Sequence, residues 1–165
     1  EQNAREPIGC VMEISDLVSP RAVLCGARAA SKKQVLQEIA HRAADVYGLE
    51  VRAVLDGLMA REKLGSTAMG NGVAIPHARI ACLKTIVGVF AQLERQVDFE
   101  AADGQGVDLI FALLAPQDAG ADHLRALAKV SRLMRDPNVR KKLRDTDNDD
   151  ALYALVTDAS TSRAA

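Results

Sequence analysis

The sequence predicts an α/β fold in a single domain. Residues 107–115 are apolar at every position except Asp108, and Pro116 follows them directly. Such a run is typical of a central strand that is covered on both faces. Residues 85–93 form a second, nearly continuous apolar run, and segments with helical spacing of apolar residues lie before and after the two runs. Strands among helices, within 165 residues, predict one α/β domain.

The composition argues against several classes of function. Hydrophobic residues make up 48% of the chain and charged residues 26%, as in an ordinary globular protein. A formal net charge of -1 does not favour binding to nucleic acid or to a membrane surface, because either needs a concentrated basic face. No apolar run approaches the ~20 residues that span a bilayer, so we expect no membrane insertion.

The three cysteines are Cys10, Cys25 and Cys82. They are widely spaced, form no CxxC pair, and do not lie near a histidine at metal-ligand spacing. This pattern predicts reduced thiols in a cytoplasmic protein, without a disulfide framework.

The first elements in the chain are a short helical turn and a strand. Residues 11–20 carry the turn, which Ser15 or Asp16 can cap and Pro20 is expected to end. Residues 21–24 then predict a short strand.

Two amphipathic helices follow. Ser31 is the predicted N-cap of the first and Gly48 its C-terminal stop. The apolar stripe between them consists of Val35, Leu36, Ile39, Ala40, Ala43 and Tyr47, and His41 lies off this stripe, as expected of an exposed side chain. The second helix has apolar residues at Val51, Val54, Leu55, Leu58 and Met59 and ends at Gly65. It brings Arg61 close to a glycine-rich loop, where the guanidinium either stabilises the helix dipole or contacts an anion held by the loop.

Residues 65–77 contain this loop and a histidine. Gly70-Asn71-Gly72 tolerates positive φ, so the backbone can turn sharply or approach a ligand closely. Residues 73–75 predict a brief strand, and Pro76 restricts the direction in which His77 leaves it. From these residues alone, His77 is either placed for chemistry or is a structural histidine after a turn.

A second histidine lies in the C-terminal half. Residues 96–99 predict a short antiparallel strand, and Asp103-Gly104 predicts a turn. A helix is predicted over residues 121–134, with the apolar positions Leu124, Leu127, Val130 (or Ser131) and Met134. His123 lies in its first turn, just beyond the strongest strand, where functional groups gather in open α/β sheets. A purely structural role at the helix N-terminus fits His123 equally well.

The sequence after residue 135 is more polar. Asp136-Pro137 breaks the helix, and residues 139–143 with Arg144 form a basic segment that predicts a solvated helix face. Asn148 or Asp149 can cap a last helix that carries Leu152, Leu155 and Val156, and residues from 157 onward are expected to fray.

Residues 61–67, Arg-Glu-Lys-Leu-Gly-Ser-Thr, continue through Gly70-Asn71-Gly72 to Ile75-Pro76-His77. This block resembles the active-site signature of the fructose/mannitol-type IIA family of the phosphoenolpyruvate-dependent phosphotransferase system, and most of all its nitrogen-regulatory IIA branch. The further matching segments are residues 87–90, 107–114 and 123–124. The resemblance covers residues 14–158, so we expect one IIA domain there, with tails at residues 1–13 and 159–165.

The resemblance implies a phosphoryl relay. The family histidine that matches His77 accepts phosphate from a small histidine phosphocarrier protein, which enzyme I charges from phosphoenolpyruvate. The match implies that His123 supports His77 and that Arg61 approaches the phosphoryl group. It also implies a mixed β-sheet covered by helices on both faces, the mannitol-type IIA fold, and transfer without a metal or other cofactor.

These implied roles fit the chemistry of the residues. Neutral imidazole is a nucleophile near pH 7, since its reference pKa is about 6.5, and transfer of a loose phosphoryl group needs positioning and charge stabilisation. We expect the amides of Gly70, Asn71 and Gly72 and the hydroxyls of Ser66 and Thr67 to donate to phosphoryl oxygens. Phosphohistidine would add about two negative charges, enough to change which partner surface fits.

The favoured hypothesis is a cytoplasmic regulatory switch of the nitrogen or potassium type, in which the phosphorylation state of His77 controls binding to target proteins. One alternative is a sugar-transport component that donates phosphate to a IIB domain, and another is a binding module that is never phosphorylated. A metal site at His77 and His123 lacks a third ligand at recognisable spacing. Ala78 stands where family members often carry glycine, which we expect to affect only loop detail. The target and the oligomeric state stay open.

Overall fold

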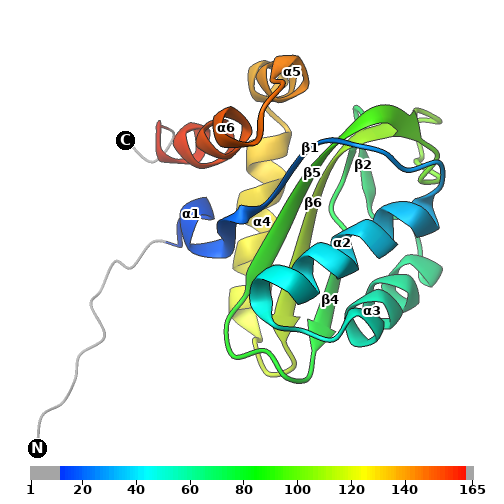
Figure 1. The fold of residues 1–165 in the computed structure, drawn as a ribbon, viewed down its shortest axis with the longest axis vertical. Helices are drawn as coiled ribbons and strands as arrows, with labels where there is room; N and C mark the ends of the chain where they lie inside the picture. The colour runs from blue at the N-terminus through cyan, green and yellow to red at the C-terminus, as the bar shows by residue number, and fades with distance from the viewer. Residues whose placement is uncertain (1–11, 163–165) are drawn as a thin grey trace, which may run out of the picture.

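The computed structural model describes residues 12–162, and the side chains of residues 12–158. In this part of the chain a mixed sheet is covered by helices on both faces (Figure 1). In chain order the elements are α1 (Ile14–Leu17), β1 (Val18–Ala27), α2 (Lys32–Tyr47), α3 (Val51–Lys63), β2 (Ala68–Gly70), β3 (Val73–Ala74), β4 (His77–Ile80), β5 (Val87–Val97), β6 (Val107–Pro116), α4 (Ala121–Met134), α5 (Pro137–Asp145) and α6 (Asp149–Ser162). The predicted α/β class and mixed sheet are confirmed. Cys10 and most of the two predicted tails lie outside the described residues, and the domain bounds stay a prediction.

The sheet is organised around β6. Its strand order is β1-β5-β6-β3-β2, and β4 pairs with β6 beyond the end of β3. β6 runs antiparallel to β5 and parallel to β3 and β4. Every side chain of β6 except Asp108 is buried, as the apolar run predicted for a central strand.

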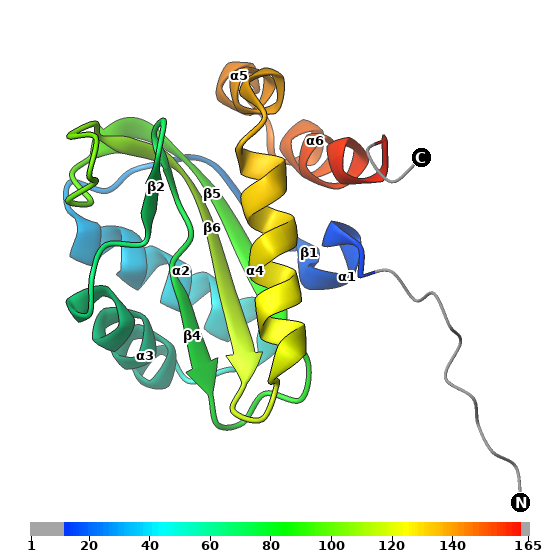
Figure 2. The ribbon, with the colours of Figure 1, turned by 180° about the vertical axis from the view of Figure 1, so that it is seen from behind.

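Helices α2 and α3 lie on one face of the sheet, and α4 crosses the other face (Figures 1 and 2). Helices α5 and α6 follow α4, and α6 packs against β1. The core between these layers is aliphatic, with Phe90 and Phe111 in an edge-to-face contact whose ring centroids are 5.9 Å apart. None of the helices in residues 12–162 is long and apolar enough to cross a membrane.

The predicted end of the first helical turn is wrong. Helix α1 ends at Leu17, and Pro20 lies inside β1. β1 is an edge strand of the sheet, and its pairing with β5 is irregular between Val18 and Val23. The missing N–H of Pro20 is therefore tolerated, since no regular ladder needs it there.

The caps of α2 are confirmed. The Ser31 hydroxyl accepts a hydrogen bond from the Gln34 N–H at 3.2 Å, and Gly48 ends the helix in the left-handed conformation with φ of 69°. His41 is exposed on this helix, as predicted.

Three strand predictions need correction. Strands β2 and β4 were not predicted, and residues 96–97 belong to β5 instead of forming a separate strand. β5 continues because Val97 pairs with Val107 across an irregularity that begins after Gln92. β2 and β3 form a hairpin that turns through Asn71 and Gly72, both with positive φ.

Helix α4 has the predicted bounds, but its buried face is rotated from the predicted stripe. Leu124 is 70% exposed. The buried positions are His123, Ala126, Val130, Leu133 and Met134. The buried stripe therefore brings His123 under the helix, toward the sheet.

The predicted fraying from residue 157 is wrong, because α6 continues to Ser162 and buries Val156. Its N-terminus is capped as predicted by Asn148, whose side-chain oxygen accepts from the Ala151 N–H at 2.8 Å.

Arg144 corrects the prediction of a solvated basic face on α5. Its guanidinium donates to both carboxylate oxygens of Asp108 at 2.9–3.2 Å and to the Asn71 carbonyl at 2.6 Å. A Cβ on Gly72 would lie 2.3 Å from Nη2 of Arg144, so only glycine fits beneath this contact. Arg144 thus ties α5 to the β2–β3 turn at the start of β6.

Candidate functional site

Three chain segments meet at an open surface pocket of about 460 Å³. The segments are the C-terminal part of α3, the start of β4 and the first turn of α4. The residues that line the pocket are Gly57, Ala60, Arg61, Leu64, His77, Ala78, Arg79 and His123. The pocket therefore collects both predicted histidines and the predicted arginine.

Helix α3 approaches β4 closely because residue 57 is a glycine. A Cβ there would lie 3.1 Å from Cβ of Ala78 and 3.3 Å from Cδ1 of Ile80. Arg61 follows one helical turn after Gly57, so this close packing carries its guanidinium to His77.

His77 is the first residue of β4, opposite Leu113 of β6. Its ring is held at both nitrogens. Nδ1 lies 2.9 Å from the Ile75 carbonyl oxygen, and Nε2 lies 3.2 Å from Nε of Arg61. A guanidinium Nε–H can only donate and a carbonyl can only accept, so the proton is on Nδ1 and Nε2 keeps its lone pair.

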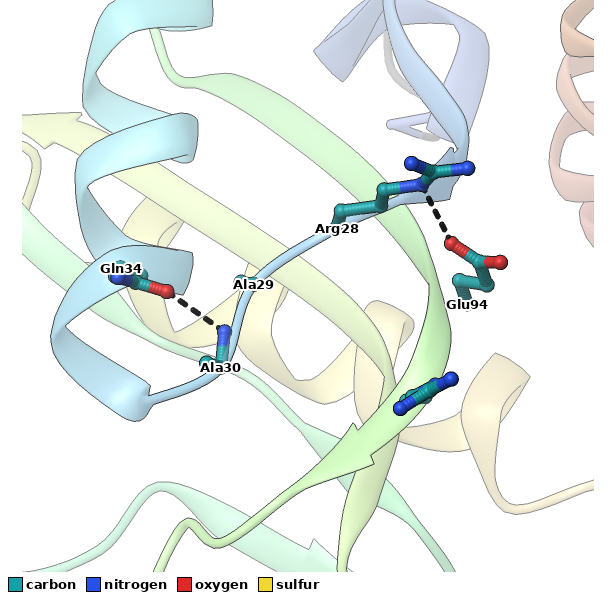
Figure 3. A pocket seen from close by; sticks show the side chains of 6 residues that line it. Arg28, Ala29, Ala30, Gln34 and Glu94 are labelled. Carbon is teal, nitrogen blue, oxygen red and sulfur yellow. Dashed lines mark hydrogen bonds and ion pairs between the residues drawn. The ribbon is translucent and has the colours of Figure 1, made fainter.

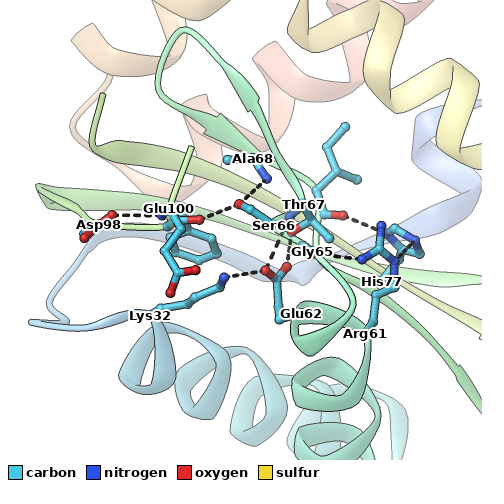
Figure 4. A network of polar contacts seen from close by, with 12 residues as sticks. Lys32, Arg61, Glu62, Gly65, Ser66, Thr67, Ala68, His77, Asp98 and Glu100 are labelled. Atoms are coloured by element: carbon cyan, nitrogen blue, oxygen red, sulfur yellow. Dashed lines mark hydrogen bonds and ion pairs between the residues drawn. The ribbon is translucent and has the colours of Figure 1, made fainter. Parts of the chain in front are cut away.

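Arg61 is itself held in two directions. Besides Nε to His77, its Nη1 donates to the Gly65 carbonyl at 2.9 Å. Figure 4 shows the guanidinium between the loop and the imidazole. The half-buried guanidinium of Arg61 therefore places a positive charge where it can stabilise an anion bound at Nε2 of His77.

His123 lies edge-on to His77, with ring centroids 5.6 Å apart and an interplanar angle of 79°. Only 7% of the residue is exposed, and its Nε2 is buried without a hydrogen-bond partner in the structure. Unsatisfied buried nitrogens are rare in folded proteins. Because it lies beside His77 at an open pocket, this nitrogen can contact a water molecule or a ligand there.

Burial lowers the pKa of His123 below its ordinary value of 6.5, and the neighbouring charges of His77 and Arg79 lower it further. His123 is therefore neutral at neutral pH. Below pH 6.5 the unfolded chain binds a proton that folded His123 still excludes, so the free energy of unfolding falls as the pH drops through that value.

We expect His123→Gln to weaken this acid sensitivity. Urea unfolding at about pH 7.5 and about pH 5.5 should show a smaller loss of stability for the variant than for the wild type. The exposed His41→Gln serves as the matched control and should behave as the wild type. An unchanged pH dependence in His123→Gln would contradict the proposed neutral state of this imidazole.

The five residues predicted to bind phosphate do not gather at this pocket. The Ser66 hydroxyl donates to the Phe99 carbonyl, and the Thr67 hydroxyl donates to Glu62. At the β2–β3 turn, the Asn71 N–H donates to Asp103 at 3.0 Å.

Gly70 precedes this turn, and Gly72 is its second residue. The Gly72 carbonyl accepts from the N–H groups of Asp108 and Leu109 at the start of β6, whereas His77 lies opposite Leu113, further along the same strand. The structure brings together His77, His123 and Arg61, and leaves the hydroxyls and the glycine turn in structural contacts.

Arg79 was not singled out from the sequence. It lines the pocket, is exposed, and donates to the Gln117 carbonyl at 3.3 Å. The two-residue period of a strand starting at His77 would have indicated it, because Arg79 then shares a face with His77. Within the described residues, no group of three or more His, Cys, Asp or Glu side chains is placed to hold a metal ion.

A larger groove of about 550 Å³ lies elsewhere, between β1, the start of α2 and β5 (Figure 3). Arg28 in this groove pairs with Glu94 at 2.8 Å, and Gln34 accepts from the Ala30 N–H at 2.7 Å. Arg28 is 86% exposed, so its ion pair is strongly hydrated. The groove holds no histidine and no cysteine, and the chemistry of the pocket at His77 is absent from it.

Comparison with known proteins agrees with this geometry. Residues 16–159 match the model of the family described as "Phosphoenolpyruvate-dependent sugar phosphotransferase system, EIIA 2". The chain belongs to this family. The match spans the fold from the end of α1 to α6, so the pocket between α3, β4 and α4 is a feature of an EIIA 2 domain.

Relatives within the EIIA 2 family are close. A nitrogen regulatory protein of Bradyrhizobium diazoefficiens is 53% identical over 145 residues, which cover 88% of this chain and 95% of that protein. The crystal structure of nitrogen regulatory protein IIA-Ntr from Neisseria meningitidis superposes with a TM-score of 0.82 at 34% identity, and covers 87% of this chain and 99% of that one. IIA mannitol from Escherichia coli has the same fold, with a TM-score of 0.71 at 20% identity over 84% of this chain and 97% of that chain.

Proposed function

We propose that this EIIA 2 domain is a regulatory phosphocarrier whose acceptor atom is Nε2 of His77, and that a histidine phosphocarrier protein is the donor. The observation that carries the proposal is the lone pair on this nitrogen. Nδ1 is committed to the Ile75 carbonyl, while Nε2 faces an open pocket between a guanidinium and a second imidazole. A neutral nitrogen nucleophile in a cationic pocket suits attack on a phosphoryl group.

The proposed transfer exchanges one P–N bond for another. The lone pair of Nε2 forms the new bond to phosphorus as the donor's P–N bond breaks, and the electron pair of that bond returns to the donor imidazole. Positive charge then grows on the ring of His77, and the Nδ1–H bond to the Ile75 carbonyl stabilises it. No proton has to leave His77 for this step.

Arg61 and His123 are proposed to hold the phosphoryl oxygens. Arg61 gives up its bond to Nε2 when phosphorus arrives and donates to the oxygens instead, still anchored through Nη1 at Gly65. His123, in the tautomer with the proton on Nε2, donates from its unpartnered nitrogen. The predicted contributions of Ser66, Thr67 and the glycine turn are not part of this proposal, because the two hydroxyls and the Asn71 N–H have other partners and neither Gly70 nor Gly72 lines the pocket at His77.

A regulatory role is favoured over sugar transport by the relatives. Identity reaches 53% with a nitrogen regulatory protein and is 30% with a fructose-specific EIIABC component of the phosphotransferase system from Bacillus subtilis. Leu64, which is 84% exposed, lines the pocket, and Leu124, which is 70% exposed, follows His123 in the chain. About two negative charges added at His77 would change the surface that a target protein meets. The regulated target and a cytoplasmic location stay predictions.

Intact-mass spectrometry at neutral to alkaline pH tests the proposal. The protein is incubated with phosphoenolpyruvate, enzyme I and the histidine phosphocarrier, and we expect the mass of one phosphoryl group to be added and to be lost in acid. No added mass, with a known IIA protein charged in the same tube, would instead support a binding module that is never phosphorylated. Transfer onward to a sugar-type IIB domain would support the sugar-transport alternative.

A further inference from the structure

A cluster of polar contacts lies next to Arg61, around Glu62 and the loop that follows α3 (Figure 4). Its members are Lys32 at the start of α2, Glu62 near the end of α3, Ser66 and Thr67 in the following loop, and Phe99 after β5. None of these side chains lines the pocket at His77.

Glu62 is the centre of the cluster. Its side chain is only 5% exposed and forms an ion pair of 2.6 Å with Lys32, whose side chain is 18% exposed. The ammonium of Lys32 also lies 5.3 Å from the centroid of the Phe99 ring. Burying two charges in this way costs desolvation energy that a well-packed apolar pair would avoid, so the fold alone does not require it.

Besides pairing with Lys32, the carboxylate of Glu62 holds the loop that follows α3. Oε2 of Glu62 accepts from the Thr67 N–H at 3.3 Å, and Oε1 accepts from the Thr67 hydroxyl. Ser66, next to it, donates its hydroxyl to the Phe99 carbonyl and accepts from the Ala68 N–H at 3.1 Å. The loop after α3 is therefore fixed by side chains at two consecutive residues.

This loop holds Arg61. The Gly65 N–H donates to the Glu62 carbonyl at 3.1 Å, which places Gly65 against the helix end. The Gly65 carbonyl then accepts from Nη1 of Arg61, while Nε of Arg61 donates to His77. Glu62 is thus connected to the guanidinium and to Nε2 of His77 by its hydrogen bonds to Thr67, by the backbone from Thr67 to Gly65, and by the Gly65 carbonyl that accepts from Arg61.

We propose, resting on the function proposed above, that Glu62 and Thr67 are positioning residues for Arg61. The carboxylate of Glu62, held in place by its ion pair with Lys32, fixes the loop at Thr67, so that the Gly65 carbonyl holds the guanidinium against Nε2 of His77. In the adjacent residues 61 and 62, Arg61 would thus contact the phosphoryl group, and Glu62 would position Arg61.

The sharpest test compares two variants of Thr67. Thr67→Val keeps the shape but loses the hydroxyl that donates to Glu62, and Thr67→Ser keeps the hydroxyl. We expect Thr67→Val to slow phosphoryl uptake about tenfold or more, since small misplacements of a charge-stabilising group have large effects. Thr67→Ser should stay within about twofold of the wild type. Uptake is measured with phosphoramidate, which needs no docking partner, and with the charged phosphocarrier.

A second readout follows Arg61 itself. The hydrogen-exchange rate of the Arg61 Nε–H, measured by NMR, should rise in Thr67→Val and return toward the wild-type rate in Thr67→Ser. A role of Thr67 in stability alone would not change the two variants in this way. This measurement tests the positioning of Arg61 even if the wild type takes up no phosphate. Absence of uptake would overturn the proposed function, and the exchange rates alone would then test whether Thr67 positions Arg61.

Glu62→Gln and the double variant Lys32→Met/Glu62→Gln distinguish an effect on the position of Arg61 from an effect on the stability of the fold. The single change leaves Lys32 buried without its counter-ion and should destabilise the fold, and the double change should restore stability. Uptake should stay slow in both, because Thr67 donates to two different carboxylate oxygens, and the amide places an NH2 group, which cannot accept, at one of the two positions. Wild-type rates and wild-type Arg61 exchange in Thr67→Val and in the double variant would overturn the inference.

Discussion

The His77→Ala variant is expected to take up no phosphoryl group, with the wild type charged in a parallel tube. The change removes Nε2 of His77, the proposed acceptor nitrogen, whose lone pair faces Nε–H of Arg61. It should lower the free energy of unfolding by no more than about 1–2 kcal/mol, because a half-buried side chain with two hydrogen bonds is lost. Intact mass and urea unfolding of the same preparation measure the two effects.

His41→Ala is the matched control for this prediction. His41 is exposed on α2 and lies outside the pocket, so this variant should gain one phosphoryl group at the wild-type rate. Acid-labile uptake by His77→Ala would mean that another group, with His123 the first to examine, is the acceptor. That result would rule out His77 as the required phosphoryl acceptor.

Arg61→Ala should slow phosphoryl uptake by about 10²- to 10³-fold, the usual effect of removing one donor that stabilises transition-state charge. Its effect on the free energy of unfolding should stay within about 1 kcal/mol, because the side chain is half-buried near a helix end. Rapid-quench measurement of a single turnover from the charged phosphocarrier gives the rate. Arg61→Lys should recover only part of it, since an ammonium cannot contact Gly65 and the phosphoryl group in one planar fork.

Arg52→Ala provides the control on the same helix. Its side chain is 88% exposed and pairs with Asp56 at 3.6 Å, so removing it should leave the rate unchanged. Equal rates in Arg61→Ala and the wild type would reduce Arg61 to a helix-end residue with no role in transfer.

The parts of the fold that local sequence signals determine could be predicted. Ser31 and Gly48 cap α2 as expected, because a capping hydroxyl and a left-handed glycine act within one helical turn. The apolar run of β6 indicated its central place for a similar reason, since burial on both faces needs an apolar side chain at nearly every position.

The long-range contacts could not be predicted in this way. Gly72 has the positive φ that its sequence suggests, but what lies against it is Arg144 from a helix far along the chain. The Thr67 hydroxyl was expected to face a phosphate and instead donates to Glu62. Periodicity describes which face of an element is apolar, and it contains no information on which distant polar group will meet a given hydroxyl.

Some residues of the candidate site could be predicted from the sequence, and others could not. The resemblance to the IIA family named His77, His123 and Arg61, and the structure places the three side chains around one pocket. Arg79 was missed because β4, which places it on the same face as His77, was not predicted. The Lys32–Glu62 pair carries no local signal, because it depends on how α2 and α3 pack together.

The Ile75 carbonyl has a consequence for the product isomer. It stands two residues before the imidazole and belongs to the backbone, immediately ahead of Pro76, so no side-chain substitution removes it. Because it accepts a hydrogen bond from Nδ1–H, only Nε2 has a lone pair that can attack phosphorus in the proposed transfer. If His77 is the acceptor, the backbone therefore selects the phosphohistidine isomer, and the product should carry phosphorus on Nε2.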